Sequence, residues 1–320
     1  MRGESHARFM TSIDVHALTK DYGRTRAVDR LTFTVRPGRV TGFLGPNGAG
    51  KSSTMRLVLG LDRPTAGTAT IAGRPYTSLA DPLRRVGALL DARAAHGSRT
   101  ARDHLLALAT SNGIASRRVE AVLEETGLAD VGRRWIKSFS LGMRQRLGIA
   151  AALLGEPDVV MLDEPSNGLD PEGIIWIREL MRSMARDGRT VLVSSHLMNE
   201  TASFADHLIV LGRGRLLADL PMQDFLDSRS RPSVRLRTSE ATRLRNVLVR
   251  RGYAPEESED GRWTVEGATA EEIGTTAATE GIPLLELSDI RPSLEEAYLD
   301  LTTNSAQFAA MPSPTSHKEA

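Results

Sequence analysis

The first two thirds of the chain alternate between strand-like and helix-like hydrophobic patterns. Short apolar or alternating runs, typical of strands, occur at residues 15–20, 31–35, 40–44, 159–162 and 191–194. Longer segments with helical spacing occur at residues 52–59, 101–109, 117–126, 141–154 and 174–185. The last two strand-like runs are apolar throughout, as in strands buried on both faces of a parallel sheet. Strands and helices in this order predict an α/β fold.

A different pattern follows from residue 233 onward. Three strand-like runs, at 233–237, 262–266 and 283–287, alternate with helical segments at 240–251, 270–280 and 294–302. We therefore expect a domain at 13–220 and a small α+β unit at 233–302. The polar stretch at 221–232 carries two prolines and suits a linker. Residues 1–12 are predicted to be a flexible tail and 303–320 a disordered one.

Composition narrows the possible functions of these 320 residues. The net charge of +1 gives no electrostatic reason to expect nucleic-acid binding. The absence of cysteine excludes disulfides and cysteine metal sites. No apolar run approaches the roughly 20 residues that span a bilayer, and the N-terminus lacks the apolar core of a signal peptide. If the protein works at a membrane, another chain must supply the membrane part.

A glycine-rich loop joins the strand at 40–44 to the helix at 52–59. It fits the phosphate-binding pattern G-x-x-x-x-G-K-[ST], with the residues Gly45, Pro46, Asn47, Gly48, Ala49, Gly50, Lys51 and Ser52. In such a loop, backbone N–H groups and the helix N-terminus surround phosphate oxygens. Lys51 would then contact the β- and γ-phosphates, and Ser52 would ligate Mg²⁺. The alternative is an ordinary glycine-rich turn.

Two adjacent carboxylates end the buried strand at 159–162. Neighbouring side chains at a strand end point in different directions, so they can serve different roles. Asp163 would hold Mg²⁺, and Glu164 would polarise the attacking water as a general base. The alternative is a strand that ends in two solvated acids.

Four further features are ambiguous on their own. Ser140 and Gly142 lie at the start of a long helix, which suits a γ-phosphate or an ordinary helix cap. His196 follows an apolar strand and could be structural or catalytic. Tyr22 precedes the phosphate loop and could be a packing aromatic.

Taken together, residues 13–218 resemble the nucleotide-binding subunit of an ABC transporter. Residues 140–146 stand where that family has its LSGGQ signature, residues 165–171 (PSNGLDP) resemble its D-loop, and His196 resembles its switch histidine. The resemblance implies a mixed-sheet core with a helical subdomain at about 77–138. It also implies that ATP contacts Tyr22, Ser53, Ser140, Gly142 and Asp170 in addition to the phosphate loop.

The sequence departs from the family at two places. Asp91 stands where the family usually has Gln, so the resemblance makes it a metal ligand with a side chain one methylene shorter than Glu. The signature itself is FSLGM, in which Leu141 and Met143 replace a glycine and a polar residue.

The resemblance implies an ATPase subunit of an ABC-2 type exporter for a drug, antibiotic or lipid-like substrate, with a role in antibiotic resistance. Two copies of the chain, or one copy and a similar subunit, would hold two ATP molecules head to tail at the cytoplasmic face of the membrane and drive a separate integral-membrane permease. A soluble ABC ATPase acting on ribosomes or DNA is the main alternative, but those proteins usually carry two cassettes or a long coiled coil. A small-molecule kinase is disfavoured by the signature and His196.

Overall fold

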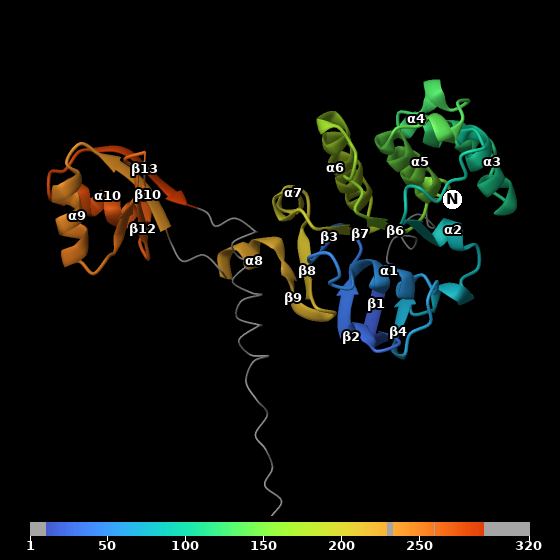
Figure 1. Ribbon diagram of the computed structural model, residues 1–320, viewed down its shortest axis with the longest axis horizontal. Helices are drawn as coiled ribbons and strands as arrows, with labels where there is room; N and C mark the ends of the chain where they lie inside the picture. The colour runs from blue at the N-terminus through green and yellow to red at the C-terminus, as the bar shows by residue number, and fades with distance from the viewer. Residues whose placement is uncertain (1–10, 229–232, 259, 291–320) are drawn as a thin grey trace, which may run out of the picture. The chain divides into compact units, whose positions relative to one another are not determined.

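The computed structural model describes residues 11–228, 233–258 and 260–290, and the chain divides into two compact units, Met1–Met222 and Gln223–Ala320. Figure 1 labels the helices and strands of each unit. The first unit contains every residue that we assigned to nucleotide binding or catalysis. The expected domain boundaries stay a prediction.

A six-stranded sheet forms the centre of the first unit. Its strands lie in the order β5 (Val86–Leu89), β6 (Val159–Asp163), β7 (Thr190–Ser195), β3 (Arg39–Leu44), β8 (His207–Gly212) and β9 (Arg215–Pro221). All neighbours are parallel except β8 and β9, which are antiparallel. The sheet is therefore mixed, as the resemblance implied.

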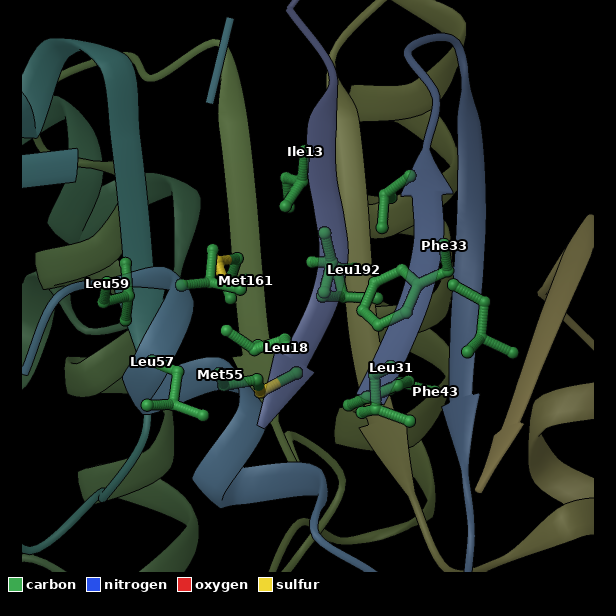
Figure 2. Packing of buried hydrophobic residues seen from close by; sticks show 14 of the residues in the cluster. Ile13, Leu18, Leu31, Phe33, Phe43, Met55, Leu57, Leu59, Met161 and Leu192 are labelled. Atoms are coloured by element: carbon green, nitrogen blue, oxygen red, sulfur yellow. The ribbon is translucent and has the colours of Figure 1, made fainter. Parts of the chain in front are cut away.

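A three-stranded antiparallel sheet packs against one part of this centre. Its order is β2 (Thr25–Val35), β1 (Ile13–Tyr22) and β4 (Ala66–Ile71). Figure 2 shows apolar side chains of β1 and β2 in one cluster with those of β3, β6, β7 and α1 (Lys51–Val58). Phe33 and Phe43 join the two sheets, with ring centroids 5.6 Å apart. This core fixes α1, and with it the phosphate loop, over the sheet.

The remaining helices of the first unit are α2 (Pro82–Arg85), α3 (Ala101–Ser111), α4 (Arg117–Glu125), α5 (Leu141–Leu153), α6 (Pro171–Arg186) and α7 (Met198–Ala202). Short 3-10 turns occupy Tyr76–Ser78, Ala129–Val131 and Ile136–Ser138. Helix α5 contacts α3, α4 and β5. The expected helical subdomain at about 77–138 also contains β5, which is a strand of the central sheet.

Several secondary-structure predictions need correction. We predicted no strands at β4, β8 or β9, although the apolar run at 208–211 resembles the one at 159–162. The predicted linker contains helix α8 (Met222–Ser228). The predicted N-terminal tail includes Thr11, which is buried and accepts a hydrogen bond from the hydroxyl of Thr190. Helix α6 begins three residues earlier than predicted because Asp170 caps it and Pro171 suits its first turn.

Within residues 233–258 and 260–290, the second unit contains a four-stranded antiparallel sheet with two helices. Its elements follow one another as β10 (Ser233–Thr238), α9 (Ala241–Arg250), β11 (Pro255–Glu257), β12 (Trp263–Glu266), α10 (Ala270–Thr279) and β13 (Leu284–Ile290). The strand order β11-β12-β10-β13 gives the ferredoxin-like βαββαβ arrangement. Alternate residues of β10 and β12 share a core with both helices. The α+β prediction matches this pattern but omitted β11, and the predicted helix at 294–302 lies outside the described residues.

Candidate functional site

The carboxyl ends of three parallel strands meet where the phosphate loop begins. Phe43 of β3 lies opposite Ser194 of β7, and Asp163 of β6 lies opposite the same serine. Ligand sites of open parallel sheets form beyond the carboxyl ends of the strands. Two sequence-distant motifs, the phosphate loop and the Asp163-Glu164 pair, are brought together at this edge.

The phosphate loop has a backbone that requires glycine. Gly50 has φ 101°, and a Cβ at this position would lie 2.5 Å from the carbonyl oxygen of Ala27. Gly48 also has a positive φ, 82°, but lies in open space. Pro46 and Asn47 are exposed at the loop tip, while Ala49 is buried beneath it. The loop thus presents backbone, with few side chains, at the start of α1.

Lys51 is a buried cation at the centre of the site. Its side chain is 6% exposed, and its Nζ donates to the carbonyl oxygen of Gly45 at 2.6 Å. The same Nζ lies 3.6 Å from Oε1 of Glu164. The ammonium group is therefore placed between the phosphate loop and the predicted base. Ser52 is exposed at the first turn of α1, and Ser53 is half-buried.

Glu164 connects three parts of the site. Its Oε2 is 2.7 Å from Nδ1 of His196, a histidine that directly follows β7. Because a carboxylate only accepts hydrogen bonds, Nδ1 carries the proton in this contact. The backbone of Glu164 is left-handed, with φ 50°, which costs a non-glycine residue on the order of 1–3 kcal/mol. Such a conformation persists only where the surrounding contacts hold it.

Ser194 holds both carboxylate residues from the neighbouring strand. Its hydroxyl donates to Oδ1 of Asp163 and accepts from the backbone N–H of Glu164 at 3.0 Å. Ser194 is fully buried. We had treated it only as the end of an apolar run, so its function was missed. The signal available in the sequence was a hydroxyl in an otherwise apolar strand that pairs with the acidic one.

Gln145 of α5 is the second residue that we had not singled out. Its Nε2 donates to the backbone carbonyl of Glu164 at 3.1 Å, and the side chain is 4% exposed. A buried amide on a helix that otherwise buries apolar residues was the available signal.

Tyr22 ends β1, close to the first turn of α1. Its hydroxyl donates to Oδ2 of Asp62 at 2.7 Å, and the ring is 45% exposed. The hydrogen bond to Asp62 raises the pKa of Tyr22, and a contact with Ser53 opposes this. The ammonium of Lys20 lies 4.9 Å from the ring centroid. The exposed ring is available for stacking, and its assignment to adenine stays a prediction.

Ser140 and Gly142 begin α5. The Ser140 hydroxyl caps this helix by accepting from the N–H of Met143 at 3.2 Å. Within the described part of the chain, neither residue hydrogen-bonds to the phosphate loop of the same chain. Their assignment to a nucleotide therefore remains a prediction.

Asp170 and Asp91 make local contacts. Asp170 accepts from the N–H of Gly173 at 2.9 Å as the cap of α6. Asp91 accepts from the N–H of Arg93 at 2.8 Å and lines a groove beside β5. Among the described residues, neither carboxylate hydrogen-bonds to Ser52 or Asp163, so both assignments remain predictions.

Replacing Ser194 with alanine should slow turnover and lower stability. The change removes the donor to Asp163 and leaves the N–H of Glu164 without its partner, a loss worth about 1–3 kcal/mol. We expect an approximately tenfold lower kcat for ATP and a lower Tm. Thr190→Val, which removes a buried hydroxyl at the opposite end of β7, should lower Tm with little change in kcat. Equal kcat losses in the two variants would contradict the assignment.

Comparison of the sequence with known proteins identifies the family to which the chain belongs. The ABC transporter family matches residues 28–167, and a domain of unknown function, DUF8746, matches residues 232–295. The bacitracin transport ATP-binding protein BcrA of Bacillus licheniformis is 36% identical, over 91% of this chain and 97% of its own length. BcrA of Enterococcus faecalis is 32% identical, over 90% of this chain and 96% of its own length.

Solved structures agree with the fold. An ATP-binding subunit of an ABC transporter superposes with a TM-score of 0.62 at 28% identity, covering 68% of this chain and 92% of that one. A dimeric ATP-binding cassette bound to ADP and Pi gives a TM-score of 0.60 at 24% identity, covering 66% and 98%. With the phosphate loop, the acidic pair and the signature helix in place, the chain belongs to the ATP-binding subunits of ABC transporters and is an ATPase.

Proposed function

We propose that this protein powers a separately encoded membrane permease that exports a drug, antibiotic or lipid-like substrate. The observation that carries the proposal is the similarity to the bacitracin transport proteins, which extends through the second unit to more than 90% of the chain. None of the helices in the described residues has the length and apolar character needed to span a bilayer. We place the protein at the cytoplasmic face of the membrane, where ATP is available.

The site geometry suggests how ATP is hydrolysed. The Glu164 carboxylate accepts a proton from water as the water oxygen attacks the γ-phosphorus, and the bond to the bridging oxygen of ADP breaks. Lys51 lies between Glu164 and the loop carbonyls, so its charge is available to the γ-phosphate. His196 holds the Glu164 side chain through its Nδ1 proton. We therefore assign the water-activating role to Glu164.

Two oxygen-bearing side chains at this edge suit Mg²⁺. Ser52 lies in the first turn of α1, and Asp163 ends β6 with one oxygen held by the Ser194 hydroxyl. Among the described residues, no group of three acidic or histidine side chains forms a protein cage. Mg²⁺ usually keeps several waters and takes one or two protein oxygens plus substrate phosphates. The residues present fit that mode, and the ion would supply charge neutralisation at the phosphates.

Two copies would complete each nucleotide site. Ser140 and Gly142 lie at the N-terminus of a 13-residue helix whose dipole favours an anion. Since neither hydrogen-bonds to the phosphate loop of its own chain among the described residues, we assign them to the γ-phosphate bound by the partner subunit. ATP would then close the pair head to tail, and hydrolysis would loosen it.

A groove beside α5 offers a docking place for the permease. It has a volume of about 550 Å³ and is lined mainly by apolar side chains of β5, of α5 and of the loop after α1, including Leu61, Leu89 and Leu147. Asp91 and His104 add polar groups, and burial lowers the pKa of His104. A short permease helix with an apolar face matches this mixture.

An introduced cysteine tests this docking because the chain has none of its own. Ala94→Cys places a thiol in the groove, and Thr110→Cys places one on the exposed side of α3. In membranes containing the permease encoded beside this chain, a thiol-specific cross-linker should join the first variant to the permease and leave the second unjoined. Equal cross-linking of both variants, or none, would contradict the proposed docking site.

A further inference from the structure

The peptide that follows Asp163 is held from two sides by buried polar side chains. Glu164 has a left-handed φ of 50° without being a glycine, a conformation that needs external support. Its N–H donates to Ser194 of β7 at 3.0 Å. Its carbonyl oxygen accepts from Gln145 Nε2 at 3.1 Å and from the N–H of Asn167 at 3.2 Å. The β7 contact comes from the central sheet, whereas the Gln145 contact comes from the signature helix.

Among the described residues, the Gln145 side chain hydrogen-bonds to the Glu164 carbonyl alone. The side chain is 4% exposed on a helix whose other buried residues are apolar. A buried amide is retained only where its hydrogen bonds are made. The Glu164 carbonyl oxygen accepts the hydrogen bond from the NH₂ group of Gln145.

Helix α5 also contacts the segment of the chain that follows Glu164. Leu141 packs on the D-loop so closely that a Cβ on Gly168 would lie 2.5 Å from Leu141 Cδ2. The guanidinium of Arg146 lies 4.4 Å from the ring centroid of Trp176 on α6. Three contacts from one helix thus span the segment from Glu164 to Trp176. The helix that begins with Ser140 cannot shift without disturbing the peptide that carries the base.

We propose that Gln145 is a positioning residue that fixes the left-handed peptide of Glu164 and couples the signature helix to the base of the same chain. The proposal rests on Glu164 being the base. Since the N-terminus of α5 serves the partner's nucleotide in the dimer, Gln145 links the half-site that a chain offers to its partner with the base that acts on its own ATP. Movement of α5 on dimer closure would then bring Glu164 into its active geometry.

Gln145→Met tests the hydrogen bond at nearly constant volume. It removes the donor while Asn167 keeps its hydrogen bond to the Glu164 carbonyl. In the full-length protein we expect kcat for ATP to fall about tenfold with KM for ATP and the Kd of a fluorescent ATP analogue unchanged within twofold. A variant that only loosened the fold would lose ATP binding and turnover together.

Gln145→Asn separates donation from packing. It keeps an amide donor but is one methylene shorter, so it leaves a larger void than Met. If the hydrogen bond matters, Gln145→Asn retains more kcat than Gln145→Met; if packing alone matters, the order reverses and the proposal is overturned. The Tm of each variant is measured beside its kcat, so that a loss of stability in one variant can be told apart from a loss of turnover.

Thr126→Val is the matched control. Thr126 is fully buried and its hydroxyl donates to the carbonyl of Val122 at 2.8 Å, so the substitution removes no hydrogen bond of Glu164 or Gln145. It should lower Tm comparably and leave kcat unchanged. If Glu164→Gln is inactive while Gln145→Met turns over at the wild-type rate, the coupling inference fails and the proposed function stands. If Glu164→Gln retains wild-type turnover, the base assignment itself fails.

Discussion

Glu164→Gln should bind ATP with near wild-type affinity and hydrolyse it about 10²–10⁴-fold more slowly. The amide has the same shape as the carboxylate and can keep its contact with His196 Nδ1, now 2.7 Å from Oε2. It cannot accept the proton of the attacking water. Lys51, 3.6 Å from Oε1, also loses a negative neighbour, so binding of the ATP phosphates should not weaken. Steady-state phosphate release and ATP binding measure the two effects separately.

The same variant should accumulate as an ATP-bound dimer, because the step that opens the pair is blocked. Light scattering with and without ATP would show the change in mass. Glu124→Gln on α4 removes a carboxylate from an exposed position and should hydrolyse ATP normally. Normal phosphate release by Glu164→Gln would show that another group activates the water.

Lys51→Ala should weaken ATP binding about 10- to 100-fold. The substitution removes a hydrogen bond between charged groups, which contributes about 1.5–3 kcal/mol to binding. The ammonium is 6% exposed and held by the carbonyl of Gly45, so solvent screens it little. Its removal also leaves Glu164 without the nearest cation. Calorimetric or fluorescence titration with ATP gives the affinity, and hydrolysis should fall with it.

Lys137→Ala provides the comparison for charge alone, since Lys137 is exposed near the start of α5 and belongs to no phosphate-binding motif. Its ATP affinity should equal that of the unaltered protein. An unchanged ATP affinity in Lys51→Ala would remove the phosphate loop from the nucleotide site.

The sequence was informative wherever a motif is continuous along the chain. The phosphate loop needs glycine at Gly50 for steric reasons, and its strand and helix neighbours have strong periodicity, so loop and context could be predicted together. The acidic pair could be predicted because it ends a fully apolar strand. These features are local, and local chemistry determines them.

Features that depend on distant residues were not predictable in the same way. Ser194 matters because β7 lies beside β6, and Gln145 matters because α5 covers the end of that strand. The sequence around Ser194 and Gln145 does not predict that these elements lie side by side. Strand β4 was missed because much of it is exposed and it has little apolar character. Strand β9 lies at the edge of the central sheet and runs antiparallel to β8. This position likewise follows only from the assembled sheet.

The position of β3 in the central sheet has a consequence for synthesis of the protein on the ribosome. This strand leads into the phosphate loop, yet both of its neighbours, β7 and β8, are encoded far later in the chain. A nascent chain that has emerged only as far as the signature helix has no partner for either edge of β3. Long-range pairing of this kind forms late. Truncated products of interrupted translation should therefore lack a formed ATP site, and would not compete with finished subunits for nucleotide.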